Sequence, residues 1–123
     1  MATFEDVQRL TSHLPEVTVS TSFATPALKV RGKSFCRLWG DRDFHKADVS
    51  GTEVLVVFCE LEEKQGLLDD GGGAVFTAPH YDGHGSVLVK LADIGEADLS
   101  ALLLESYLLK APKSIRSALG DPA

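Results

Sequence analysis

A group of basic residues is the first feature of this sequence that could do chemistry. Lys29, Arg31 and Lys33 fall within five positions, in a segment that otherwise reads as two short strands. Lysine and arginine at such spacing neutralise the phosphates of a nucleic acid. They also keep an exposed sheet edge from pairing with another molecule, which is a purely structural role. Lys110 and Lys113 either extend the same positive surface or complement the C-terminal end of a helix.

This positive charge stands out because the whole chain has a net charge of −6. Residues 27–46 carry six basic and two acidic side chains, whereas residues 47–70 carry one basic and seven acidic ones. The net charge argues against a general nucleic-acid binder, since such domains are usually basic. The local field decides what a patch attracts, however, and here it is positive around the first segment.

The segment Pro79–Gly85 holds two imidazoles and a carboxylate. His80, Asp82 and His84 are all residue types that bind zinc. No helix presets their geometry, and no fourth ligand lies near them in the sequence. We therefore predict a polar loop without a bound metal, in which His80 and Tyr81 are candidate contacts to a ligand or a partner.

No other arrangement predicts catalysis or a cofactor. The glycines after Asp70 precede a strand-like segment, whereas a phosphate-binding glycine loop needs a helix after it. Ser, His and Asp are present without the Gly-x-Ser-x-Gly elbow of a hydrolase. Cys36 and Cys59 lie in apolar, strand-like contexts, which indicates buried thiols rather than a disulfide. The sequence thus predicts a protein that is not an enzyme and has no cofactor.

Length and composition predict one globular domain over residues 1–123, with 44% hydrophobic and 24% charged residues. The longest apolar runs, Val54–Phe58 and Ala101–Leu104, are far shorter than the roughly 20 residues of a membrane span. No secretory signal is visible at the N-terminus. We therefore expect a cytoplasmic location.

The spacing of apolar residues predicts the elements that position these side chains. Helices are expected at Thr3–Leu14, Glu60–Leu68, Glu96–Lys110 and Lys113–Leu119. Strands are expected on both sides of Gly32 and at Glu53–Cys59, Ala74–Thr77 and Ser86–Leu91, with a short extended segment at residues 17–20. Hairpins without crossover helices imply an α+β, two-layer sandwich with a mainly antiparallel five-stranded sheet and helices on one face.

The hairpin within residues 25–39 is expected to turn at Gly32 and Lys33, in a type II′ turn whose first position needs a positive φ. The side facing the core would then hold Leu28, Val30, Phe35, Arg37 and Trp39. Arg37 would point inward, so we expect it to pair with an internal acid. A shift of the loop by one residue would alter this facing.

Three pieces of the chain together resemble the MmcQ/YjbR family of small bacterial proteins. They are Thr25–Phe35, Pro79–Val89 and Glu105–Lys113. The resemblance implies an α-β-β-β-α-β-β-α sandwich similar to that of secretion chaperones, and DNA binding on a double-wing surface. The family tends to have Trp where this chain has Ser86, so an aromatic contact of that surface would be missing.

The leading hypothesis is a non-enzymatic binding module of this type. It would bind double-stranded DNA weakly and in a salt-dependent manner through Lys29, Arg31 and Lys33, together with Lys110 and Lys113. The alternative is a protein-interaction module resembling secretion chaperones, which uses the sheet face or an acidic helix and has no nucleic-acid role. Either module would be a monomer or a homodimer.

Overall fold

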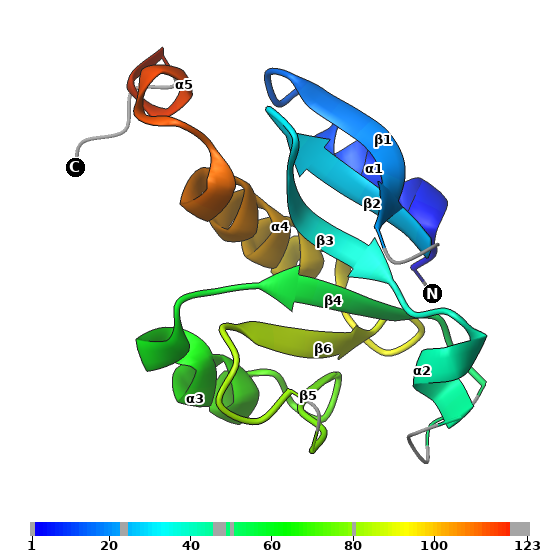
Figure 1. The fold of residues 1–123 in the computed structure, drawn as a ribbon. Coiled ribbons are helices and arrows are strands. Elements are labelled where there is room, and N and C mark those ends of the chain that lie inside the picture. Colours follow the sequence, from blue (N-terminus) through cyan, green and yellow to red (C-terminus); the bar gives the residue numbers. More distant parts are fainter. Residues whose placement is uncertain (1, 23–24, 46–48, 50, 80, 119–123) are drawn as a thin grey trace.

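The computed structural model describes residues 2–22, 25–45, 49, 51–79 and 81–118. The strands are Val17–Ser22 (β1), Thr25–Val30 (β2), Lys33–Leu38 (β3), Val54–Phe58 (β4), Val75–Phe76 (β5) and Ser86–Lys90 (β6). The helices are Phe4–Thr11 (α1), Asp41–His45 (α2), Leu61–Asp70 (α3), Glu96–Lys110 (α4) and Lys113–Ala118 (α5). The strands form one antiparallel sheet in the order β1-β2-β3-β4-β6-β5, and α1 and α4 lie along one side of it (Figure 1).

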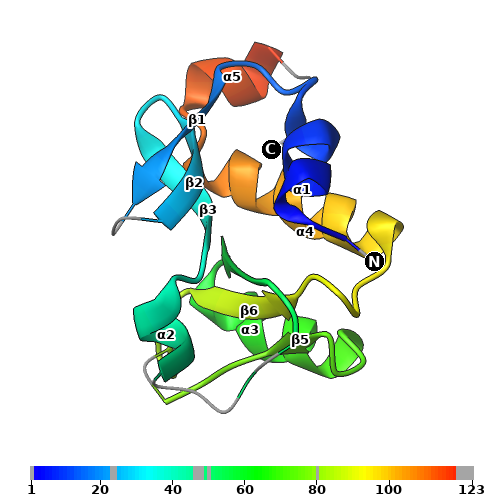
Figure 2. The same cartoon turned by 90° about the vertical axis from the view of Figure 1, so that its right-hand side faces the viewer.

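The structure confirms the expected α+β class, with the main helices α1, α3 and α4 packed on one face of the sheet. Figure 2 shows the two layers from the side, with β1 to β3 in one and α1 with α4 in the other. The sheet has six strands instead of five, because residues 17–22 pair with β2 along their whole length. The short helix α2 forms at residues 41–45, outside the helices and strands that the sequence predicts. None of the helices in the described ranges is long and apolar enough to cross a membrane.

The main core lies between the sheet and helices α1, α3 and α4. Tyr107 ties α4 to the rest: its ring meets that of Phe35 edge-on at 5.7 Å, and its hydroxyl donates to the carbonyl of Pro15 at 2.7 Å. Burying side chains of this size contributes about 1.5–3 kcal/mol each. The buried stripe of α4 comprises Leu99, Leu102, Leu103 and Tyr107.

The opposite face of the sheet carries a smaller core. Trp39, Val56 and Leu88 are buried there, with Phe44 of α2 and Tyr81 of the 77–85 loop packed against them. The Trp39 ring meets that of Phe44 edge-on at 5.2 Å and stacks near that of Tyr81 at 6.3 Å. This cover is partial, and the uncovered part of the face holds the candidate site.

The hairpin turns one residue earlier than expected. Val30 pairs with Lys33, so Arg31 and Gly32 are the loop residues, and both have positive φ, at 50° and 81°. Two positive φ values in a two-residue loop define a type I′ turn rather than the predicted type II′. The expectation failed because glycine also suits the second position of a type I′ turn.

A β-bulge in β3 corrects the predicted facing of the hairpin. The pairing passes from Leu28 and Cys36 to Lys29 and Ser34, which leaves Phe35 as an extra residue. Phe35 and Cys36 therefore both join the main core. The alternation beyond the bulge is reversed, so the prediction that Arg37 and Trp39 share the face of Phe35 was wrong.

Candidate functional site

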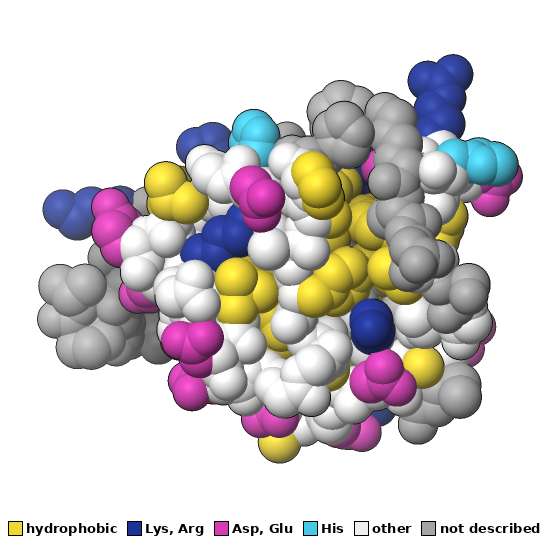
Figure 3. Space-filling view, turned by 90° about the horizontal axis from the view of Figure 1, so that it is seen from below, with side chains coloured by type: hydrophobic (Ala, Val, Ile, Leu, Met, Phe, Trp, Pro, Cys, Tyr) yellow, Lys and Arg dark blue, Asp and Glu magenta, His cyan; other side chains and the backbone are white. Residues whose placement is uncertain are grey.

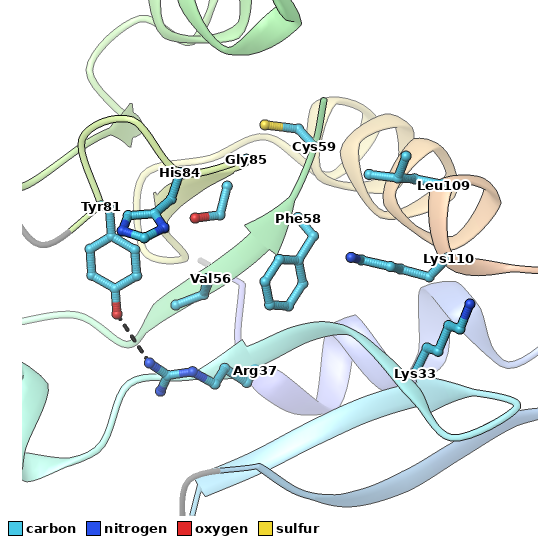
Figure 4. A pocket seen from close by; sticks show the side chains of 11 residues that line it. Lys33, Arg37, Val56, Phe58, Cys59, Tyr81, His84, Gly85, Leu109 and Lys110 are labelled. Carbon is cyan, nitrogen blue, oxygen red and sulfur yellow. Dashed lines mark hydrogen bonds between the residues drawn. The ribbon is translucent and has the colours of Figure 1, made fainter. Parts of the chain in front are cut away.

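The uncovered part of the second sheet face is hollowed into a pocket of about 760 Å³. Figure 4 shows its walls, which come from the ends of β3, β4 and β6, the loop after Tyr81 and the C-terminal end of α4. Its lining comprises Lys33, Arg37, Val56, Phe58, Cys59, Tyr81, His84, Gly85, Ser86, Leu109 and Lys110.

The charge of this lining has one sign. Lys33 is the first residue of β3, Arg37 lies near the end of the same strand, and Lys110 ends α4. None of the described residues that line the pocket is acidic. Like charges that line a hollow with low-dielectric walls concentrate the local potential, so the lining favours an anion over a cation although the chain as a whole is acidic.

Arg37 is the cation that the fold holds most firmly. It is 9% exposed, and its Nη1 lies 3.2 Å from Oδ2 of Asp43, while Nη2 donates to the hydroxyl of Tyr81 at 3.0 Å. The same carboxylate oxygen accepts the backbone N–H of Gly40 at 2.9 Å, near the start of α2. The expectation that Arg37 pairs with an internal acid is therefore confirmed, on the other face of the sheet.

The hydroxyl of Tyr81 joins two elements. It accepts a hydrogen bond from Arg37 and another from Nε1 of Trp39, at 3.0 and 3.2 Å. A phenol oxygen has two acceptor sites, so its own proton remains as a donor. No acceptor for that proton is found in the described part of the chain, and the ring lines the pocket. Tyr81 thus offers a neutral donor beside a fixed guanidinium.

Lys64 of α3 fixes the loop that carries Tyr81. Its Nζ donates to the backbone carbonyls of Tyr81 and His84, at 2.5 and 3.1 Å, and the residue is 7% exposed. The sequence pattern does not predict this burial of Lys64. Spacing along a helix does not reveal that a distant loop brings two carbonyls to a lysine.

The remaining wall combines apolar and cationic groups. The Lys110 ammonium lies 4.9 Å from the centre of the Phe58 ring, a cation–π contact. Val56 and Leu109 complete this apolar side. In Figure 4, Lys33 rises from the hairpin toward Lys110. A ligand whose anionic group lies near these two ammonium groups could place an apolar part against Val56, Phe58 and Leu109.

The five predicted basic residues separate into two sets. Lys33 and Lys110 both line the pocket. Arg37 lines it with them, although the sequence did not predict it as a binding residue. Arg31 instead forms a bidentate pair with Glu16, at 2.6 and 2.9 Å. Lys29, half-buried on β2, and Lys113, exposed at the start of α5, do not line the pocket.

The structure places one of the two candidate contact residues of the 79–85 loop at the pocket. Tyr81 lines the pocket, and so does His84, which is exposed. His80 lies outside the described residues. Asp82 accepts a hydrogen bond from the Thr77 hydroxyl at 3.2 Å. In the described ranges, no three His, Cys, Asp or Glu side chains are grouped so that they could hold a metal ion.

The two cysteines are free thiols. Burial raises the pKa of Cys36 to about 12. Burial also raises the pKa of Cys59, although the nearby Lys64 opposes that shift. Because the thiolate is the reactive form, neither residue is activated as a nucleophile near neutral pH.

Ser86 lies at the pocket with its residue only 3% exposed. The family resemblance predicts Trp at this position. Ser86 pairs with Phe58 across β4 and β6. Its side chain is much smaller than that of Trp, so it fills less of the space beside the Phe58 ring.

Solved structures share this fold. A crystal structure of a Deinococcus radiodurans protein with a DUF419 domain matches with a TM-score of 0.69 at 23% identity, covering 99% of this chain and 91% of that one. A Pseudomonas syringae protein matches with a TM-score of 0.69 at 13% identity, covering 88% of this chain and 98% of that one.

Sequence comparison identifies the family. Uncharacterised proteins from Mycobacterium bovis and Mycobacterium tuberculosis are 34% identical over 129 residues, covering 96% of this chain and 95% of each relative. The YjbR family model matches residues 12–109, which span β1 to α4 and include every residue that lines the pocket except Lys110. The chain therefore belongs to the YjbR family.

Proposed function

We propose that this protein is a non-enzymatic, cytoplasmic binding module whose pocket holds a small organic anion. The observation that supports it is the convergence of Lys33 and Arg37, from near the two ends of β3, with Lys110 of α4 on a pocket that has no acidic side chain among its described lining residues. Charge-assisted hydrogen bonds from such groups are the strongest that proteins offer to phosphate and carboxylate.

The size and the apolar wall narrow the ligand class. A volume of about 760 Å³ falls within the roughly 300–1,000 Å³ of small-molecule sites. The side formed by Val56, Phe58 and Leu109 suits an apolar body. We therefore propose a phosphate monoester with an apolar or aromatic body, whose phosphate lies between Arg37 and the two lysines.

Calorimetric titration with phenyl phosphate and with inorganic phosphate tests this proposal. We expect phenyl phosphate to bind more tightly, since its ring adds contact with the apolar wall. Lys33→Ala and Lys110→Ala should each weaken binding about threefold to tenfold, the range for loss of one partly exposed charge contact. Lys113→Ala is the matched control and should bind like the wild type. Equal affinity in all four proteins, or no binding at all, would contradict the proposal.

Double-stranded DNA is a second candidate ligand, and one observation favours it. Within the described residues, Lys29, Lys33, Lys110 and Lys113 take part in no ion pair, so their charges are not neutralised by neighbouring carboxylates. Lys29 is the residue that separates the two candidates, because it belongs to the hairpin but does not line the pocket.

A labelled duplex titrated at low and at moderate salt tests the DNA candidate. DNA binding on the hairpin predicts an affinity that falls steeply with salt, because counterions are released from the phosphates. Lys29→Glu should then abolish DNA binding and leave the phenyl phosphate affinity unchanged. If no duplex binds at low salt, this candidate is excluded, while the small-anion proposal is unaffected.

A further inference from the structure

A second hollow lies between α3 and α4. Two cavities, of about 390 and 220 Å³, share Leu67, Leu102 and Glu105 in their linings, so they form one continuous groove, which we call the α3–α4 groove. Helix α3 packs against β5 and β6, whereas α4 packs against β3 and β4, and the groove runs between them.

The floor of the α3–α4 groove is apolar. Leu67, Leu102 and Leu108 form its centre, and Val75 and Ile94 extend it toward β5. All five side chains also belong to the main core or pack against it, so the floor is held in place by the fold itself. Figure 3 views the molecule from below, the side on which α3 lies in Figure 1, and shows acidic side chains spread over that face with hydrophobic ones between them.

The rim of the groove is acidic. Its exposed carboxylates are Glu60, Glu63, Asp70, Asp98 and Glu105. None of these five forms an ion pair within the described part of the chain. Among the described lining residues, Arg116 of α5 is the one basic side chain, in the part of the groove that Phe58 also lines. A cationic partner would therefore gain attraction along the rim without displacing an existing salt bridge.

We propose that the α3–α4 groove docks a basic amphipathic helix of a partner protein. The leucine floor would receive the apolar face of that helix, and the carboxylates would pair with lysine or arginine at its edges. Helix α3, which borders the groove, has 10 residues and is about 15 Å long, so it matches about three turns of a docked helix. The proposal does not depend on the anion pocket.

A synthetic peptide of 14 residues tests this directly. Its leucines are placed at i, i+3, i+4 and i+7 and lysines fill the other positions, and a scrambled peptide of equal composition is the control. We expect the amphipathic peptide to bind and the scrambled one to bind at least tenfold more weakly. The methyl NMR signals of Leu67, Leu102 and Leu108 should shift on binding.

Charge-neutral variants separate docking from general attraction. Glu63→Gln with Glu105→Gln removes two rim charges and should weaken binding of the amphipathic peptide at least fivefold. Glu62→Gln with Glu5→Gln removes the same amount of charge outside the groove, and the affinity for the amphipathic peptide should stay within twofold of the wild-type value. Lys33→Ala should have no effect.

Four outcomes would overturn the proposal. They are no binding of the peptide, equal binding of the scrambled peptide, equal losses in both double variants, and methyl shifts away from the groove. Self-association through the groove, seen as a concentration-dependent sedimentation coefficient that Glu63→Gln with Glu105→Gln abolishes, would identify a second copy of this chain as the occupant instead.

Discussion

At the scale of single residues, the site depends on how the Arg37 guanidinium is held. Asp43 offsets part of its charge, and the hydroxyl of Tyr81 fixes the direction of Nη2. A buried charge without partners would carry a large desolvation cost, which these contacts reduce. Arg37 is thus a fixed cation, whereas Lys33 is exposed and Lys110, half-buried, contacts the Phe58 ring at the pocket wall.

The Tyr81 hydroxyl gives a testable prediction at this scale. Tyr81→Phe keeps the ring on Trp39 but removes the acceptor for Arg37 and for the indole N–H. We expect the free energy of unfolding to fall by about 1–3 kcal/mol, the cost of leaving buried donors unpaired. Urea denaturation measures it, and the phenyl phosphate affinity should fall as well. An unfolding free energy within about 0.5 kcal/mol of the wild type would show that neighbouring groups replace the hydroxyl.

For Arg37, the sequence predicted the kind of partner but not the face of the sheet on which the side chain lies. The sequence predicted that Arg37 points inward and pairs with an acidic residue, and that residue is Asp43. The face on which it lies was mispredicted, because one extra residue at Phe35 reverses the alternation. A bulge of this kind leaves no mark in the hydrophobic pattern, since both Phe35 and Cys36 are apolar.

At the scale of elements, α3 has two separate roles. Its buried Lys64 pins the 81–84 segment on the pocket side, and its Leu67 with Glu63 borders the α3–α4 groove. The predicted range of this helix, Glu60–Leu68, agrees with the observed Leu61–Asp70 to within two residues. The tertiary role of Lys64 could not be predicted, because it depends on carbonyls 17 and 20 residues away.

The element-scale prediction concerns this contact between α3 and the loop. Lys64→Met keeps the length of the side chain and removes its ammonium, so the carbonyls of Tyr81 and His84 lose their donor. We expect the amides of residues 81–84 to exchange with deuterium about tenfold faster, because the loop then opens locally. Exposed Lys113→Met is the control and should leave that exchange unchanged. Unchanged exchange in Lys64→Met would mean that the loop is held by its own turns.

At the scale of the whole molecule, the surface has two hollows of opposite charge: the pocket has a basic lining and the α3–α4 groove has an acidic rim. The basic segment that the sequence singled out contributes Lys33 and Arg37 to the pocket, and the acidic segment after it contributes Glu60, Glu63 and Asp70 to the groove. The sequence therefore predicted the fold class, the family and the charge contrast. Both cavities arise from packing between elements distant in the chain, which local patterns do not contain.

Cys59 lies where those two hollows meet. It lines both the pocket with Lys33, Arg37 and Lys110 and the α3–α4 groove, and it is partly exposed, whereas Cys36 is fully buried. Maleimide labelling under mildly alkaline conditions should therefore attach one dye to the native protein, without engineered cysteines. The emission of that dye would report occupancy of either hollow, so a single labelled sample would follow an added anion and an added peptide in turn.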